Sequence, residues 1–162
     1  MALVLSALNK KPLYINHSKI VTIVDDEAQT VALSYTEGDQ LKVAHLAGIG
    51  DKVQVLGVTI TLNQFFKGKI AKIALQGSQD IVINTEQVYK AVTEVTGGKL
   101  VARRVYNYLN RECGINRQNI DKLVGSAKEV TRLDKGETRT VVSNIEFSTY
   151  NGIVFSAKVL NA

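Results

Sequence analysis

The chain reads LNRECGINRQNIDKL over residues 109–123, and this stretch decides how its second half folds. Gly114 stands between apolar residues at helical spacing, namely Leu109, Cys113, Ile115, Ile120 and Leu123. Glycine ends helices readily because it accepts the left-handed conformation, and an apolar stripe marks the face that packs inward. The stretch therefore predicts two helices joined by a tight turn, over about residues 99–112 and 117–128, with Asn116 as the cap of the second.

Further helix and strand signals flank this pair. Residues 85–96 repeat apolar side chains every three or four positions before two glycines end the segment, which predicts a helix. Residues 141–149 and 153–160 alternate in polarity, and Asn151-Gly152 lies between them. Both residues of an Asn-Gly pair accept the positive φ of a type I′ turn, so a hairpin is expected there. The predicted order over residues 85–162 is helix, helix, helix, hairpin.

The first 84 residues carry a different pattern, that of strands. β-Branched residues recur with a period of two, and turn residues such as Asp25-Asp26-Glu27 and Glu37-Gly38-Asp39 separate the runs. Many short strands with close turns favour a small barrel or a strongly bent sheet, because closure hides the strand edges. We therefore expect an α+β protein. A small N-terminal β-barrel domain spans residues 1–84, and a three-helix segment with a C-terminal β-hairpin, in the order of a winged helix, spans residues 85–162.

The 162 residues carry a net charge of +5, and the excess is concentrated in the second part of the chain. Residues 1–98 hold nine lysines, no arginine and nine acidic residues. Residues 99–162 hold all six arginines and five lysines against six acidic residues. A module as basic as this favours a polyanionic partner, above all nucleic acid.

Several classes of protein are excluded by composition. One cysteine and two histidines provide neither an internal disulfide nor a zinc site of the Cys/His type. No spaced pair of acid and base is present, so we expect no enzyme, no metal and no cofactor. No apolar run reaches the roughly 20 residues of a membrane-spanning helix, and we expect a cytoplasmic protein without a membrane partner.

Positive side chains form a line along the predicted helix of residues 99–112. Every fourth position is basic or an amide, with one more arginine alongside: Lys99, Arg103, Asn107, Arg111 and Arg104. At about 1.5 Å per residue the line spans roughly 18 Å, over which a helix can follow the phosphates of a duplex. A solvated helix face explains the same spacing, and both interpretations stand at this point.

The stretch over residues 109–123 resembles the helix-turn-helix family, in which a glycine makes the turn and apolar sites hold two helices at a steep angle. The resemblance implies that the second helix enters a DNA groove with these residues exposed: Asn116, Arg117, Gln118, Asp121 and Lys122. Arginine and glutamine can each make two hydrogen bonds to a base edge. The alternative is a helical hairpin that only packs on the sheet.

Three segments of the first half, GDKVQV (50–55), KGKIAKI (67–73) and IVI (81–83), resemble the KOW and Tudor type of SH3-like barrel. The resemblance implies binding of nucleic acid or of transcription and ribosomal partners. The basic contacts that it implies are Lys67, Lys69 and Lys72. Taken whole, the chain is similar to the MotB family of transcription modifiers from T-even bacteriophages, which implies sequence-tolerant DNA binding and effects on host chromatin.

Together these observations predict a non-enzymatic DNA-binding protein of weak sequence specificity that modulates transcription or nucleoid organisation. Its expected contacts to double-stranded DNA are Lys99, Arg103, Arg104, Arg111, Arg117, Gln118 and Lys122, with Lys67, Lys69 and Lys72 as a secondary surface. Phosphate contacts position a protein on DNA without reading its sequence. Two rival functions stay open: an RNA-binding translational regulator, and a protein-interaction or assembly module of a phage. Host transcription or nucleoid proteins are further candidate partners, and an oligomer is compatible with each function.

Overall fold

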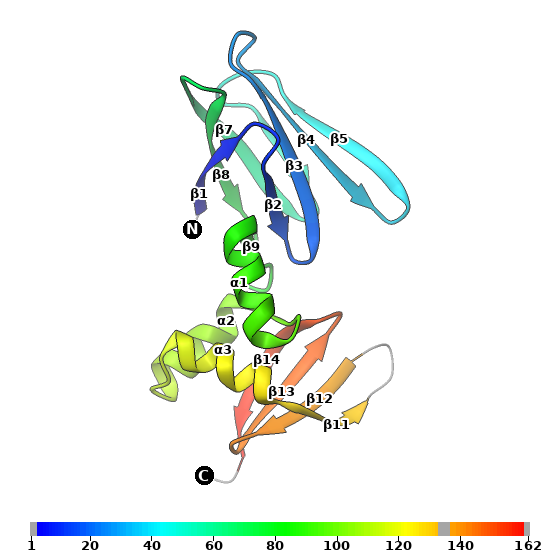
Figure 1. Cartoon of the computed structure of the whole chain (residues 1–162), viewed down its shortest axis with the longest axis vertical. Helices are drawn as coiled ribbons and strands as arrows, with labels where there is room; N and C mark the ends of the chain where they lie inside the picture. Colours follow the sequence, from blue (N-terminus) through cyan, green and yellow to red (C-terminus); the bar gives the residue numbers. More distant parts are fainter. Residues whose placement is uncertain (1–2, 133–136, 161–162) are drawn as a thin grey trace. The chain divides into compact units, whose positions relative to one another are not determined.

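The computed structural model describes residues 3–132 and 137–160, and the chain divides into two compact units (Figure 1). Unit 1 comprises residues 1–78 and 83–86, and unit 2 comprises residues 79–82 and 87–162. The regular structure of unit 1 consists of strands, that of unit 2 combines helices with strands, and the strands form three sheets in the described part of the chain. None of the helices in these residues is long and apolar enough to cross a membrane.

Unit 1 consists of two antiparallel sheets, with the strand orders β1-β8-β7-β6 and β5-β4-β3-β2-β9. The strands are β1 (Leu3–Leu8), β2 (Pro12–Ile15), β3 (Ser18–Asp25), β4 (Thr30–Glu37), β5 (Gln40–Leu46), β6 (Lys52–Val55), β7 (Val58–Phe66), β8 (Ile70–Gln76) and β9 (Ile83–Thr85). Apolar side chains alternate along the central strands: Val58, Ile60 and Leu62 of β7 are fully buried, and so are Val31 and Leu33 of β4. Each sheet therefore turns one face into the core of unit 1.

The predicted closed barrel of residues 1–84 is wrong, because the strands of unit 1 form two open sheets. The edge strands are β1 and β6 in one sheet and β5 and β9 in the other. Alternation with a period of two is the same in an open sheet and in a barrel, so the sequence pattern does not report closure. The sheets are joined where β1 leads into β2, since the Lys10 amide donates to the Thr22 carbonyl oxygen over 2.7 Å.

Residues 53–62 alternate like one strand but form a hairpin. β6 ends at Val55 and β7 begins at Val58, with Leu56 and Gly57 between them at φ 50° and 82°. Two positive φ values in a two-residue loop are those of a type I′ turn, whose first position usually holds Asn, Asp or Gly. Because leucine occupies that position, the sequence pattern does not indicate a turn there.

Unit 2 is a five-stranded sheet with helices packed on one face (Figure 1). The strand order is β10-β14-β13-β12-β11, with β10 parallel to β14 and the other neighbours antiparallel. The elements are α1 (Glu86–Thr96), β10 (Leu100–Val101), α2 (Arg103–Asn107), the π-helical turn η1 (Tyr108–Glu112), α3 (Arg117–Ser126), β11 (Lys128–Arg132), β12 (Glu137–Val142), β13 (Ile145–Tyr150) and β14 (Ile153–Val159).

A buried cluster joins the helices of unit 2 to its sheet. Val105 and Leu109 come from α2 and η1, and Ile120 and Val124 come from α3. The sheet contributes Phe147, which is among the largest fully buried side chains, with Ile145 and Val154. Because Ile145, Phe147 and Thr149 point to the helices, Glu146 and Ser148 between them point to the opposite face of the sheet.

The prediction of a three-helix segment followed only by a hairpin is wrong for residues 85–162. Three helices do follow one another, but a four-strand meander comes after them and β10 adds a fifth strand. The run predicted as one strand over residues 141–149 contains a turn at Ser143–Asn144, where φ is 48° and 64°. Part of the polar segment before that run, residues 133–136, lies outside the described residues.

The helix predicted from residue 99 begins only at Arg103. Leu100, Val101 and Ala102 are buried in succession, which one stripe of an amphipathic helix does not allow. Leu100 and Val101 instead pair with Ile153 and Val154 of β14. A buried parallel strand reads as a continuous apolar run, and here the run is too short to be distinguished from the start of a helix.

Two local predictions in unit 2 are confirmed. Tyr150 pairs with Ile153 across Asn151 and Gly152, whose φ values of 52° and 76° make the predicted hairpin turn. α1 ends at its two glycines, where the Gly98 amide donates to the Thr93 carbonyl oxygen over 2.8 Å. This is the bond of a Schellman motif, which uses glycine in the left-handed conformation just after a helix.

Candidate nucleic-acid interface

Basic side chains gather on the helices of unit 2. We call residues 87–127, which contain nearly all of α1 together with α2, η1 and α3, the helical layer. This segment holds seven lysines and arginines against three acidic residues, so it carries +4 of the net charge of +5. Its basic residues are Lys90, Lys99, Arg103, Arg104, Arg111, Arg117 and Lys122. The rest of the chain is close to neutral.

Three of these cations are exposed and make neither an ion pair nor a ring contact with any residue that the structure describes: Arg103, Arg111 and Lys122. Arg103 begins α2, Arg111 lies in η1, and Lys122 lies in the middle of α3. Gln118 is exposed one turn before Lys122 and shares its face of the helix, because residues four apart are neighbours on a helix surface. These donors remain open to a ligand.

Arg104 is engaged within unit 2. One guanidinium nitrogen, Nη2, lies 3.0 Å from the Asp80 carboxylate and donates to the Phe155 carbonyl oxygen over 2.8 Å. Arg104 therefore links α2 to β14 and to the segment before β9. Both side chains of the ion pair are more than half exposed, so the pair adds less than about 1 kcal/mol to stability. The sequence predicted that Arg104, like Arg103, contacts DNA. In the structure Arg104 is held by Asp80 and Phe155, whereas Arg103 makes no ion pair with the described residues.

Tyr106, Asp121 and Arg117 hold α2 against α3. The Tyr106 hydroxyl donates to the Asp121 carboxylate, and the Arg117 guanidinium lies 5.5 Å from the centre of the Tyr106 ring. Burial, reinforced by the hydrogen bond to Asp121, raises the pKa of the Tyr106 hydroxyl far above its ordinary range. Burial also raises the pKa of Asp121, against the opposing effects of the Tyr106 hydrogen bond and the Arg117 charge. The hydroxyl and the carboxylate are thus engaged with each other and half-buried, whereas Arg117 is exposed at the start of α3.

The turn before α3 is fixed by amide side chains. The Asn116 side chain accepts a hydrogen bond from the Asn119 amide over 2.9 Å, which confirms it as the N-cap. Asn110 donates to the Ile115 carbonyl oxygen over 2.9 Å, and the Ile115 amide donates to the Leu109 carbonyl oxygen over 3.0 Å. The bond made by Asn116 sets where α3 begins, the bond made by Asn110 holds the turn before it, and the first turn of α3 is exposed.

The predicted line of charges at every fourth position is interrupted. Lys99 is half-buried and lies before β10, outside any helix. From Tyr108 to Glu112 the backbone is a π-helix, in which the hydrogen bonds span one more residue than in an α-helix. The i, i+4 spacing from Arg103 to Arg111 therefore does not describe one straight row. Single π-helical turns are frequent at functional sites, but no sequence signal marks this one.

The lysines singled out in the first half belong to unit 1. Lys67 and Lys69 flank Gly68 in the turn between β7 and β8, with Lys69 at φ 58°. Lys72 is exposed on β8, where its backbone pairs with Ser6 of β1. All three are exposed in or near the β7–β8 hairpin of unit 1.

The comparisons with known proteins identify no relative. Scans against models of protein families, against curated proteins and against solved structures each give no match. Within the described residues, no group of three or more His, Cys, Asp or Glu side chains is placed to hold a metal ion.

Proposed function

We propose that this protein binds double-stranded DNA without catalysis, through phosphate contacts made by the helical layer of unit 2. The observation that carries the proposal is the net charge of +4 on residues 87–127, together with exposed Arg103, Arg111 and Lys122 that no carboxylate of the described residues neutralises. A cationic surface of this kind gains free energy when bound phosphates release their condensed counterions. Weak sequence specificity follows, because phosphate contacts carry no base information.

Within this interface the side chains contact different groups of the DNA. Arg103, Arg111 and Lys122 contact phosphates, and Arg117 at the exposed start of α3 adds a fourth cation. Gln118 is the uncharged side chain of the set, and its paired amide donor and acceptor suit it to a base edge. The basic hairpin of Lys67, Lys69 and Lys72 is a secondary surface in unit 1.

Charge reversal tests the proposal. The double variant Arg103→Glu/Arg111→Glu is compared with Lys19→Glu/Lys52→Glu, which makes the same change in net charge at exposed positions of unit 1. Fluorescence anisotropy of a short labelled duplex should give an affinity roughly tenfold or more below wild type for the first variant and near wild type for the second. Equal losses in the two variants would mean that only net charge matters, and the proposed interface would be withdrawn. Stronger binding of single-stranded RNA than of the duplex would favour the RNA-binding alternative.

A second candidate function is protein interaction by strand addition at β5. This strand pairs only with β4 among the described residues, and its outward Leu41 and Val43 are 72% and 49% exposed. An exposed edge with apolar side chains is the surface to which a partner strand adds. Concentration-dependent light scattering that is abolished by Leu41→Lys would support this function, and a monomer at all concentrations would remove self-association by this route.

A further inference from the structure

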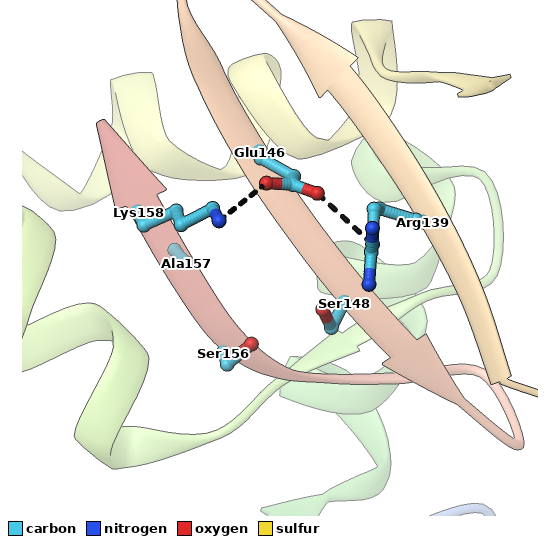
Figure 2. Close-up of a pocket in the computed structure, with 6 residues that line it drawn as sticks. All are labelled: Arg139, Glu146, Ser148, Ser156, Ala157 and Lys158. Carbon is cyan, nitrogen blue, oxygen red and sulfur yellow. Dashed lines mark ion pairs between the residues drawn. The ribbon is translucent and has the colours of Figure 1, made fainter. Parts of the chain in front are cut away.

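A pocket lined by charged and hydroxyl-bearing residues lies on the face of the unit 2 sheet that points away from α2 and α3. It has a volume of about 320 Å³ and is lined by Arg139, Glu146, Ser148, Ser156, Ala157 and Lys158 (Figure 2). The lining comes from three neighbouring strands, β12, β13 and β14. The pocket is thus separate from the exposed cations of the helical layer.

An ion cluster forms one side of this pocket. The two carboxylate oxygens of Glu146 lie 3.0 Å from Arg139 Nε and 3.2 Å from Lys158 Nζ, so both are engaged. The Glu146 side chain is 10% exposed, against 47% for Arg139 and 69% for Lys158. A nearly buried carboxylate between two more exposed cations leaves a net charge of +1 facing the solvent. It also restrains both cations, because each must stay close to it.

Hydrogen-bond donors exceed acceptors in the pocket. Arg139 uses Nε for Glu146, and among the described residues neither its two terminal nitrogens nor the other two protons of Lys158 have a partner. Ser148 and Ser156 are paired across β13 and β14 and lie in the same row as Arg139. Neither serine side chain has a hydrogen-bond partner among the residues that the structure describes. Figure 2 shows both hydroxyls on the same face of the sheet as the ion cluster.

We propose that this pocket binds a phosphate group. Guanidinium and ammonium donors with two hydroxyls match the tetrahedral set of acceptors on a phosphate, and the net positive charge favours an anion. A metal cation is disfavoured, since both Glu146 oxygens already contact cations. Glu146 is a positioning residue: it holds Arg139 on one side of its carboxylate and Lys158 on the other. The site is independent of DNA binding by the helical layer, because it lies on the other face of the sheet.

Titration with inorganic phosphate, at constant ionic strength with chloride as the balancing anion, tests the site. Backbone amide shifts from nuclear magnetic resonance should move saturably at Ser148, Ser156 and Lys158 while those of unit 1 stay in place. Ser148→Ala/Ser156→Ala keeps the ion cluster and should weaken phosphate binding by roughly tenfold, because hydrogen bonds to a charged group are lost. Lys158→Gln should also weaken it, and it leaves Glu146 paired with Arg139. The matched control is Ser6→Ala/Ser34→Ala in unit 1, which should bind like wild type.

The source of the phosphate is distinguished by two further probes. Methyl phosphate represents a monoester, such as a phosphorylated metabolite or a strand end, and dimethyl phosphate represents the diester of a nucleic-acid backbone. Saturation by methyl phosphate alone supports a monoester site, and saturation by both supports a site that also accepts the backbone. Shifts that are not saturable, or that survive unchanged in the double serine variant, would overturn the proposal and leave the cluster as a purely structural ion network. This result does not bear on duplex binding by Arg103 and Arg111, which is measured separately.

Discussion

Replacing Gly125 with alanine tests how closely α1 and α3 are docked in the helical layer. A Cβ atom at this position would lie 2.2 Å from the Val95 carbonyl oxygen and 3.3 Å from the Val95 carbonyl carbon. Ordinary contact begins at 3.4 Å, so the last turn of α1 must move from α3 by about 1 Å. The obstacle is backbone, which cannot rotate away as a side chain can. Overpacking of this kind costs roughly 1–3 kcal/mol.

The net effect is smaller than this cost, because alanine favours a helix over glycine by up to about 1 kcal/mol. We expect a loss of about 1–2 kcal/mol in the free energy of unfolding, and for a urea dependence near 2 kcal/mol/M the midpoint falls by about 0.5–1 M. Far-ultraviolet circular dichroism is the assay, since nearly all described helical residues belong to unit 2. Ser126→Ala at the neighbouring exposed position is the control and should stay within about 0.5 kcal/mol of wild type. A midpoint for Gly125→Ala at or above that of wild type would refute the close docking.

Two further predictions concern the turn before α3 and the half-buried pair of Tyr106 and Asp121 in the helical layer. Asn116→Ala removes the cap of α3 and should lower the stability of unit 2 by about 1 kcal/mol in the same urea assay, and an unchanged midpoint would show that the cap is not formed. The raised pKa of Asp121 means that the folded state holds this proton more tightly than the unfolded chain, so its stabilising contribution is present below the unfolded value of 3.8 and is lost as the pH rises through the folded value. The Asp121→Asn variant has no titrating group at this position. The free energy of unfolding of the variant minus that of wild type should therefore increase between about pH 3.5 and pH 7. A difference that does not change with pH would contradict the raised pKa of Asp121.

Turns and helix ends could be predicted from the sequence wherever they contained the residues that usually form them. Asn151-Gly152 and the two glycines after α1 are in this class, and so is the cap at Asn116. The turns at Leu56–Gly57 and Ser143–Asn144 have the same positive φ values but begin with residues that rarely adopt them. Each of these turns divided a run that looked like a single strand.

The sequence pattern did not show which strands pair with one another. The predicted barrel and the predicted three-helix segment with one hairpin were wrong for this reason. Alternation along a strand identifies a buried face but does not name the neighbouring strand, so open sheets and a barrel look alike. The same limit applies to β10, because its two residues are a strand only through their pairing with β14. A four-strand meander in place of one hairpin follows from the turn at Ser143–Asn144 and from β11 and β12.

The charged residues of the candidate site were visible in the sequence, but their surroundings were not. The excess of basic residues after residue 98 is a property of composition. That Arg104 meets Asp80 and Phe155 depends on contacts between distant segments. Arg139, Glu146 and Lys158 become one cluster only through the register of β12, β13 and β14, which no local pattern specifies. The hydrogen bond from Tyr106 to Asp121 could not be predicted, because a tyrosine in a helix does not by itself indicate which residue it contacts.

The dependence of duplex affinity on salt tests the central claim most directly. Four phosphate contacts by Arg103, Arg111, Arg117 and Lys122 predict that a plot of log affinity against log salt concentration has a slope of about −3.6. Removing two of them in Arg103→Gln/Arg111→Gln should reduce the magnitude of the slope by about 1.8. A wild-type slope near zero, or a slope that the double variant leaves unchanged, would contradict DNA binding through the helical layer.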